Sequence, residues 1–277
     1  MTPKNTTKKL RKSAEQWILD RSTLRRIEKR TTVNYSTKWR NAQKYAEHIP
    51  TPLENLGKNL FQASRILMLD GTFTKVNGIT KCIHIAYDTG IGVIDYWIDD
   101  SENKTAYWYL LRRVEEKGYK PIICLSDGNT SILQILKEKN IPHQQCIFHL
   151  LQFLRRELTK KVFGYEIPKP YKVLYSRIKF IFKAKNLESV AKGIENIRIL
   201  TPCFTLPKQK KVLKWFWKNV ISATIRHSYN EDIPSTTNQL ENLNGQIKQR
   251  IKTMRGLKSE ESLNKILKIL FYFKNFK

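Results

Sequence analysis

Two aspartates stand at the ends of short apolar runs in this 277-residue chain. Asp70 closes the run at residues 66–69, Asp127 closes the run at residues 122–126, and a glycine follows each aspartate. Such runs are typical of strands buried on both faces, which have no structural use for a terminal carboxylate. If the two strands are neighbours, the carboxylates meet at one sheet edge, where glycine permits close approach of a ligand or of backbone. Carboxylates placed in this way repel each other unless they share a proton or a cation. We expect a metal ion.

A third carboxylate, Glu241, lies near the start of a predicted helix. The helix begins at residues 235–238 and carries an apolar stripe at spacings of three and four, with Glu241 on its flank. Two interpretations remain open for Glu241. It could bind metal, or it could form a capping box with Asn238 and bond back to the helix start.

Three carboxylates suit the hydrolysis and transesterification of phosphodiesters. Two metal ions roughly 3.5 to 4 Å apart activate the nucleophile and stabilise the leaving oxygen in such reactions. Mg²⁺ prefers a few carboxylates together with phosphate oxygens and water. We expect two ions of Mg²⁺ or Mn²⁺, with Asp70 bridging both, Asp127 holding one and Glu241 the other. Four rival carboxylates lie on predicted strands or turns and are expected to be solvated: Asp88, Asp95, Asp99 and Asp100.

The charge of the chain points to a polyanionic partner. Lys and Arg number 51 against 24 Asp and Glu, which gives a formal net charge of +27. A surplus of this size is typical of nucleic-acid-binding proteins. No segment approaches the roughly 18 apolar residues of a membrane helix, and the N-terminus is polar. We therefore expect no membrane partner and a cytoplasmic, nucleoid-associated protein with reduced cysteines.

The first 58 residues are expected to be helical and to bind DNA. Residues 1–12 are basic and expected to fray. Residues 22–41 have the layout of a helix-turn-helix, with Leu24 and Ile27 on the first helix and Trp39 anchoring the second. The second helix would carry Lys38, Arg40 and Lys44 toward DNA. The alternative is a plain pair of basic helices packed on the main domain. Prolines and Gly57 predict a linker at residues 50–57.

The remaining chain is expected to form one α/β domain with a helical insertion. Residues 59–160 predict three antiparallel strands with a hairpin at Asn77-Gly78, a helix at 103–116, the second Asp strand, a helix, and a short strand at 145–148. The order is βββαβαβα. Residues 161–234 predict a helical insertion whose Trp215-Phe216-Trp217 cluster is interpreted as core, with base stacking as the alternative. Residues 235–277 predict two helices that complete the domain. Basic residues on the first of these helices are candidate DNA contacts: Lys248, Arg250 and Arg255.

The ordered motifs resemble a known family. Leu69-Asp-Gly-Thr, Ser126-Asp-Gly, Cys146-Ile-Phe-His149 and the run from Thr237 to Lys248, followed by Arg255-Gly256, resemble the DDE transposases of the Mutator-like group and related bacterial insertion sequences. The resemblance covers about residues 65–260. It implies a ribonuclease H-like mixed sheet, a helical insertion before the third acidic residue, and metal-dependent cutting and joining at element ends. Asp70, Asp127 and Glu241 match the family's catalytic triad, which favours the metal role of Glu241.

Cys146 and His149 match the Cys-x2-His signature of the same family. We interpret Cys146 as a packing residue and His149 as a hydrogen-bonding or proton-transfer group near the metals. A structural zinc site is the alternative, but zinc normally needs four ligands. Cys82 and His84 could complete such a site only if their face of the strand turned toward the pair.

These observations predict a DNA transposase. It would cleave DNA at the terminal inverted repeats of its element, join the released end to target DNA, and work as a dimer or larger assembly, as the resemblance implies. One alternative is an inactive or host-adopted copy that binds DNA without cutting it. Another is a ribonuclease H-like metal-dependent nuclease or junction resolvase that cuts without strand transfer.

Overall fold

The computed structural model describes residues 3–19, 27–29, 33–159, 166–229, 232–253 and 257–275. It has an α/β fold with a mixed five-stranded sheet. The chain divides into two compact units, one formed by residues 1–122 and 238–277 and the other by residues 123–237. The first unit therefore joins both ends of the chain. No helix in the described ranges combines the length and the apolar character that crossing a membrane requires.

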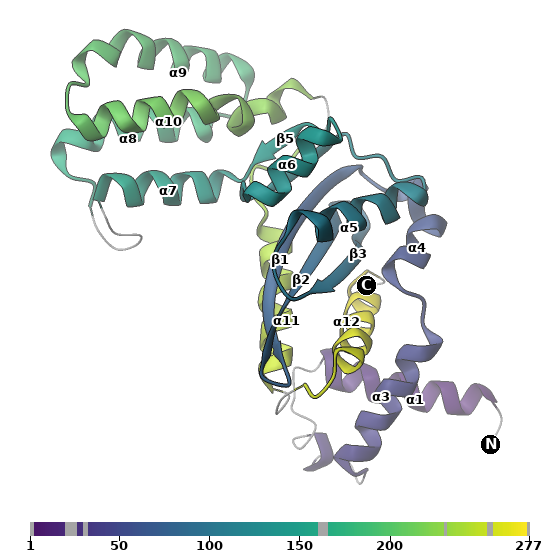
Figure 1. The fold of residues 1–277 in the computed structure, drawn as a ribbon. Helices are drawn as coiled ribbons and strands as arrows, with labels where there is room; N and C mark the ends of the chain where they lie inside the picture. Colours follow the sequence, from purple (N-terminus) through teal and green to yellow (C-terminus); the bar gives the residue numbers. More distant parts are fainter. Residues whose placement is uncertain are drawn as a thin grey trace. The chain divides into compact units, whose positions relative to one another are not determined.

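Three antiparallel strands form the sheet of the first unit (Figure 1). They are β1 (Ile66–Val76), β2 (Ile79–Asp88) and β3 (Gly92–Asp99). The chain turns between β1 and β2 at Asn77 and Gly78, whose φ angles of 48° and 81° suit a type I′ hairpin. The predicted meander is confirmed. Its register places Asp70 opposite Ile85 of β2.

Helix α5 (Lys104–Glu116) packs against β2 and β3. Asn103 caps its N-terminus, because the Asn103 side chain accepts a hydrogen bond of 2.8 Å from the backbone N–H of Ala106. The residues of the predicted apolar face are all buried: Ala106, Tyr107, Leu110, Leu111 and Val114. Gly118 follows the helix with a φ of 86°, which glycine adopts without steric penalty.

The segment predicted as a linker is a helix. Helix α4 (Pro52–Asn59) begins with a capping box between Thr51 and Glu54, and the 3-10 turn η1 (Leu60–Gln62) follows it. Proline is compatible with the first turn of a helix, where its missing N–H has no partner to lose. The prolines therefore mark a helix start here, and the prediction of a linker is wrong.

Two helices of the N-terminal region pack against each other. They are α1 (Pro3–Leu19) and α3 (Tyr35–His48), and the rings of Trp17 and Trp39 meet edge to face with centroids 5.1 Å apart. The expected fraying of residues 1–12 is wrong from Pro3 onward. The reason is that Leu10, Ala14 and Trp17 recur at helical spacing and are buried.

The predicted helix-turn-helix is not confirmed. Its second helix corresponds to α3, but its first helix and turn include residues 22–26 and 30–32, which lie outside the described residues. Helix α3 also packs on α12 (Glu260–Asn275), where the ring of Tyr45 stacks on Phe273 with centroids 6.0 Å apart. This contact is the one expected for the alternative, a helical pair packed on the main domain.

The last two helices belong to the first unit. Helix α11 (Asn238–Thr253) runs beside β1 (Figure 1), and α12 follows it. Both helices were predicted, at residues 235–254 and 259–273. The order β1, β2, β3, α5, β4, α6, β5, α7 is also the predicted βββαβαβα.

The second unit starts with a parallel strand pair. Its strands are β4 (Ile123–Ser126) and β5 (His143–Gln145), with α6 (Thr130–Glu138) between them in sequence. The short strand predicted around residues 145–148 is present as β5, but it lies earlier in the chain: β5 ends at Gln145 and α7 (Ile147–Thr159) begins at Ile147. The side chain of Gln144 fixes this early position. It donates to the Ala223 carbonyl and accepts from the Arg226 backbone N–H.

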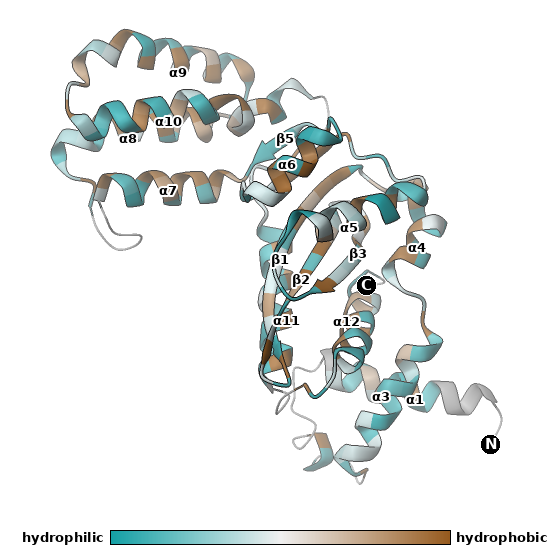
Figure 2. Ribbon diagram, in the orientation of Figure 1, coloured by the Kyte–Doolittle hydropathy of each residue, from teal (hydrophilic) through white to brown (hydrophobic). Residues whose placement is uncertain are grey.

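Helices make up the rest of the second unit. They are α7, α8 (Lys169–Phe182), α9 (Leu187–Leu200) and α10 (Pro207–Thr224), with the 3-10 turns η2 (Thr201–Cys203) and η3 (Ile225–Ser228). Each of the four helices carries both hydrophobic and hydrophilic residues (Figure 2). Phe216 is fully buried, and Trp215 stacks on Phe153 with ring centroids 4.9 Å apart. The interpretation of this cluster as core is confirmed for both residues, whereas Trp217 is 38% exposed.

Asp88 is buried, although we expected it to be solvated. Its carboxylate accepts hydrogen bonds from three backbone N–H groups and one phenol: those of Ser64, Gly90, Ile91 and Tyr119. These partners satisfy the carboxylate in the interior, so burial costs little. Asp88 therefore stabilises the turn after β2.

Asp95 on β3 is the second carboxylate that departs from the expectation. It is 1% exposed, and the nearest guanidinium nitrogen of Arg113 lies 3.3 Å away. Burial raises the pKa of Asp95 to about 7, although Arg113 and a backbone hydrogen bond lower it. The sequence could not predict this, because the neighbours that bury Asp95 come from other elements.

We expect ionisation of Asp95 to lower the free energy of unfolding as the pH rises from about 4 to about 7. The folded state binds the Asp95 proton more tightly than the unfolded state, so stability present at low pH is lost as the folded carboxyl ionises. Urea denaturation should give a lower free energy of unfolding for the wild type at pH 8 than at pH 5. Asp95→Asn should reduce this difference by roughly 2 to 3 kcal/mol. The exposed Asp100→Asn serves as control. Identical pH dependence in wild type and Asp95→Asn would contradict the assignment.

Candidate active site

Asp70 is the first polar residue after the buried run of β1. Residues Ile66, Leu67, Met68 and Leu69 are at most 5% exposed, and Asp70 is partly buried. Its Oδ1 accepts from the backbone N–H of Gly71 at 2.9 Å, and its Oδ2 accepts from the side-chain amide of Asn244 at 2.7 Å. Both oxygens of the carboxylate are therefore oriented by hydrogen bonds.

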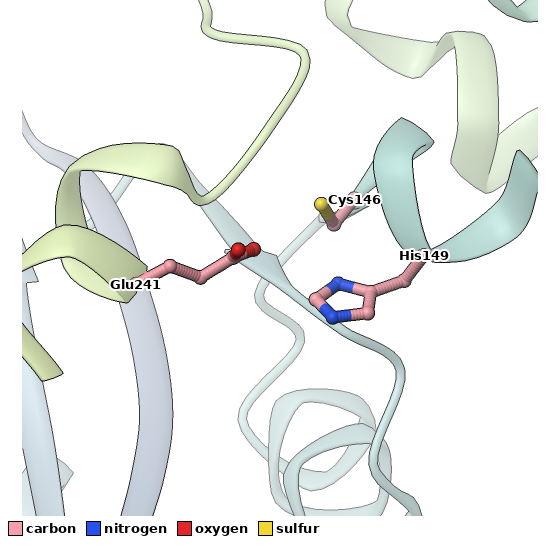
Figure 3. Close-up of side chains that lie close together, drawn as sticks. All are labelled: Cys146, His149 and Glu241. Atoms are coloured by element: carbon pink, nitrogen blue, oxygen red, sulfur yellow. The ribbon is translucent and has the colours of Figure 1, made fainter. Parts of the chain in front are cut away.

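Asn244 and Glu241 lie one turn apart on α11. The helix is held by its buried residues Leu240, Leu243 and Ile247. Residues three apart on a helix are neighbours on one face, so Glu241 lies on the face of α11 that meets Asp70. Figure 3 shows the Glu241 side chain extending from α11. The first unit thus brings Asp70 together with the helix face that carries Glu241.

Helix α11 begins at Asn238, so Asn238 and Glu241 both lie in its first turn. A capping box between them needs Asn238 at the N-cap position, within one residue of the helix start. The metal and the capping interpretations of Glu241 both stay predictions.

Asn244 is a further residue at this site that is absent from the candidates predicted from the sequence. Its side chain is 7% exposed, and its Oδ1 atom is buried with no hydrogen-bond partner among the described residues. A buried amide oxygen without a partner is unfavourable unless a donor or a cation reaches it. The signal in the sequence is its spacing, three residues after Glu241 on the same helix face.

The oxygen donors of the first unit fit a divalent cation. Asp70 and Glu241 offer carboxylates, and Asn244 offers the amide oxygen that has no partner. Mg²⁺ and Mn²⁺ bind oxygen ligands of these two kinds. The residue types are thus ones that such a cation binds, and the metal itself stays a prediction.

Gly71 follows Asp70 for a packing reason. A Cβ atom at Gly71 would lie 2.9 Å from the carboxylate of Glu102 and 3.2 Å from the Cys82 sulfur. The sequence predicted that this glycine admits a ligand or backbone, whereas side chains of the same unit occupy the space. The same holds for Gly128, where a Cβ atom would lie 2.5 Å from the Gln145 amide.

Asp127 lies in the second unit, directly after β4, and is exposed. Its Oδ1 accepts a hydrogen bond of 2.9 Å from the backbone N–H of Asn129. Asn129 in turn caps α6 by accepting from the backbone N–H of Ser131. Gly128 has a φ of 88°, which is a left-handed conformation. The turn thus fixes the backbone of Asp127 while its side chain reaches solvent.

Cys146 directly precedes α7, and His149 lies in its first turn (Figure 3). The Cys146 sulfur and a ring nitrogen of His149 lie within 4.8 Å of each other. The Thr237 hydroxyl also donates to the sulfur at 3.4 Å. Burial alone would raise the pKa of Cys146, but hydrogen bonds to His149 and Thr237 outweigh burial and lower it. Cys146 is fully buried, which agrees with its predicted packing role.

Cys82 and His84 have core contacts of their own. Both are fully buried on β2. The His84 ring meets Tyr107 edge to face, with centroids 4.8 Å apart, and its Nδ1 lies 3.4 Å from the Trp97 carbonyl. Burial lowers the pKa of His84 and raises that of Cys82 to about 12, so both groups stay neutral. Side chains and backbone of β2, β3 and α5 surround this pair, and His84 Nε2 is buried without a hydrogen-bond partner among the described residues. The zinc alternative stays a prediction.

The candidate DNA contacts differ in exposure. Lys38 and Arg250 are each 4% exposed, and the Lys38 ammonium donates to the Gln16 side chain at 2.8 Å. Burial lowers the pKa of Lys38. These two side chains are therefore withdrawn from solvent, contrary to what DNA contact requires. Arg40, Lys44 and Lys248 are exposed. Arg255 lies outside the described residues.

Comparison with known proteins places these motifs in a family. The chain is similar to the "Transposase for insertion sequence element IS905" of Lactococcus lactis subsp. lactis (strain IL1403), with 28% identity over 227 residues. The similarity covers 76% of this chain and 54% of the relative, so the chain spans about half the length of that protein. A family profile described as "Transposase, Mutator family" matches residues 55–276. Because this match covers most of the sequence, including β1, β4 and α11, the chain belongs to the Mutator family of transposases.

Proposed function

We propose that the chain is a DNA transposase that cleaves DNA at the ends of its element and joins the ends to target DNA. The observation that carries the proposal is the family match over residues 55–276. The similarity to an insertion-sequence transposase supports it. The order βββαβαβα with a mixed sheet supports a ribonuclease H-like fold for the catalytic domain.

Asp70, Asp127 and Glu241 are the proposed ligands of two divalent ions. When bound, such ions supply an activated nucleophile and stabilise the leaving oxygen of the phosphodiester. Asp70 lies on β1 and Glu241 on α11, and these two elements are in contact in the first unit. The exposed Asp127 carboxylate is accessible to a cation from solvent. The oxygen chemistry of these residues supports Mg²⁺ or Mn²⁺.

The neighbours of these carboxylates have supporting roles. Asn244 orients Asp70 through its hydrogen bond of 2.7 Å. His149 is the proposed hydrogen-bonding or proton-transfer group, and Cys146 is the packing residue that holds it. Such outer partners fix the orientation of ligands and tune their basicity.

DNA is the proposed partner, both at the terminal inverted repeats and at the target. The formal net charge of +27 supports a polyanionic partner. Arg40, Lys44 and Lys248 are the proposed phosphate contacts because their side chains are exposed. A homodimer or larger assembly on DNA is also proposed, as the resemblance to the family implies.

Substitution of the proposed ligands tests the site. We expect Asp70→Asn and Glu241→Gln to lower Mg²⁺-dependent cleavage of the DNA that flanks the gene. The loss should exceed the roughly 10- to 100-fold typical of outer-sphere changes, because each substitution removes a charged ligand. Cleavage is measured on labelled duplexes with matched Asp100→Asn protein as control. Wild-type rates in either variant would reject the assignment.

Asn244 offers a separate test of positioning. Asn244→Ala removes the donor to Asp70, so we expect roughly 10- to 100-fold lower cleavage together with a higher Mg²⁺ requirement. Asn242→Ala is the matched control, because Asn242 is exposed on the same helix. The Mg²⁺ concentration for half-maximal cleavage separates positioning from general damage. If both variants show the wild-type Mg²⁺ requirement, Asn244 has no role at Asp70.

Substitution of exposed and of buried basic side chains tests the proposed DNA contacts. We expect Arg40→Ala and Lys44→Ala each to weaken duplex binding and to reduce the slope of log K against log salt by about 1. Lys38→Met should leave that slope unchanged, because the Lys38 ammonium is buried against Gln16. Fluorescence anisotropy at several salt concentrations measures the slopes. Equal slope changes in Lys38→Met and Lys44→Ala would contradict this distinction.

A further inference from the structure

The second unit contains a cavity of about 820 Å³ that the proposed catalysis does not use. Its walls come from the start of α7, the loop at residues 183–186, the turn η3 and the segment at residues 232–236. Ligand pockets commonly measure 300 to 1,000 Å³. The cavity is therefore large enough for a ligand of nucleotide size.

Arg226 builds the wall of this cavity. It is 9% exposed, and its guanidinium donates to the carbonyls of Phe182, Ala184 and Ala223 at 2.9 to 3.1 Å. These bonds tie the loop after α8 to η3. Among the described residues, no ion pair involves Arg226. Its guanidinium is hydrogen bonded to neutral carbonyls.

The cavity attracts anions. Lys183 and Lys185 line it and are exposed, and Arg226 adds a third cation. Asp232 is the carboxylate among the lining residues. Three cations against one carboxylate leave a positive balance, which suits a phosphate.

His227 also lies in the wall of the cavity. Its ring is hydrogen bonded to the backbone of Ala184, and its Nε2 is buried, with no hydrogen-bond partner among the described residues. Burial and the neighbouring Arg226 lower the pKa of His227, so the ring is neutral near pH 7 and adds no charge to the cavity.

Apolar side chains complete the lining. Phe148 is 44% exposed and Leu187 is 56% exposed, and both line the cavity. The Phe148 ring is held edge to face against His149, with centroids 5.6 Å apart. An exposed aromatic ring beside lysines is a common platform for an unpaired base.

We propose that this cavity binds one unpaired nucleotide of a DNA strand. Phe148 and Leu187 contact the base, and Lys183 with Lys185 bind the adjacent phosphates. The inference rests on the proposed DNA substrate and adds to it a site for a base outside the duplex.

Binding without cleavage tests the proposal. Anisotropy is measured in EDTA with a labelled 12-nucleotide single strand and with a blunt duplex of the same sequence. We expect Phe148→Ala to weaken single-strand binding about tenfold and to leave duplex binding within about twofold, because only an unpaired base stacks on the ring. Phe148→Trp should retain binding. The control is Phe180→Ala, 54% exposed on α8 and outside the cavity. Equal losses in Phe148→Ala and Phe180→Ala overturn the proposal.

Paired lysine variants test the phosphate contacts. Lys183→Ala with Lys185→Ala should reduce the salt slope for the single strand by about 1.4, as expected for two lost phosphate contacts. Lys210→Ala with Lys218→Ala is the matched control, since both lysines are exposed on α10 and outside the cavity. Equal slope changes for the two pairs count against the site.

The cavity's ligand could be a free deoxynucleoside monophosphate or a nucleotide within a DNA strand. Competition by the free monophosphate distinguishes these two. Displacement of the strand only by oligonucleotides supports the proposal. Displacement by a monophosphate at the same concentration as the oligonucleotide overturns the assignment to a DNA strand. Absence of duplex binding in the wild type contradicts the proposed function, whereas intact duplex binding with no selective loss in Phe148→Ala contradicts the cavity alone.

Discussion

The hydrogen bond from Asn244 to Asp70 joins two residues that are 174 positions apart in the sequence. It is short, at 2.7 Å, and its acceptor is charged, so it belongs to the stronger class of protein hydrogen bonds. It ties the helix that carries Glu241 to the strand that carries Asp70. Because α11 is also held by buried leucines, the relation between Asp70 and this helix face is set by packing as well as by polar contact.

The contacts of Asp88 and Asp70 distinguish a structural carboxylate from a candidate catalytic one. Asp88 is saturated by backbone N–H groups and a phenol, and Asp95 is buried beside Arg113. Asp70 instead accepts from a neutral amide whose own oxygen has no partner. An orphaned oxygen beside a carboxylate is costly in the interior unless a ligand satisfies it. The Asp88 site is complete in itself, whereas Asp95 Oδ2 and the Asn244 oxygen beside Asp70 are both buried without a hydrogen-bond partner among the described residues.

Local sequence patterns predicted the strands, turns and helices. The burial of individual polar side chains depends on packing between elements that are distant in the sequence. The apolar run before Asp70, the Asn77-Gly78 hairpin and the stripe of α11 are local signals, and all three are confirmed. The burial of Lys38 and Asp88 depends on partners from other elements, such as Gln16 and Tyr119, which no local pattern reveals. The start of α7 was missed because Gln144, an ordinary polar residue in the sequence, is anchored by Ala223 and Arg226. Asn244 could have been found from its spacing, but its contact with Asp70 could not.

Binding of Mn²⁺ to the full chain, followed by electron paramagnetic resonance, decides whether the three acidic residues act as one site. We expect wild-type protein to bind Mn²⁺, and Asp70→Asn, Asp127→Asn and Glu241→Gln each to weaken that binding at least about tenfold, more than one lost outer-sphere contact. Asp100→Asn should bind as wild type does. Wild-type Mn²⁺ affinity in Asp127→Asn or Glu241→Gln would show that these carboxylates hold no common metal.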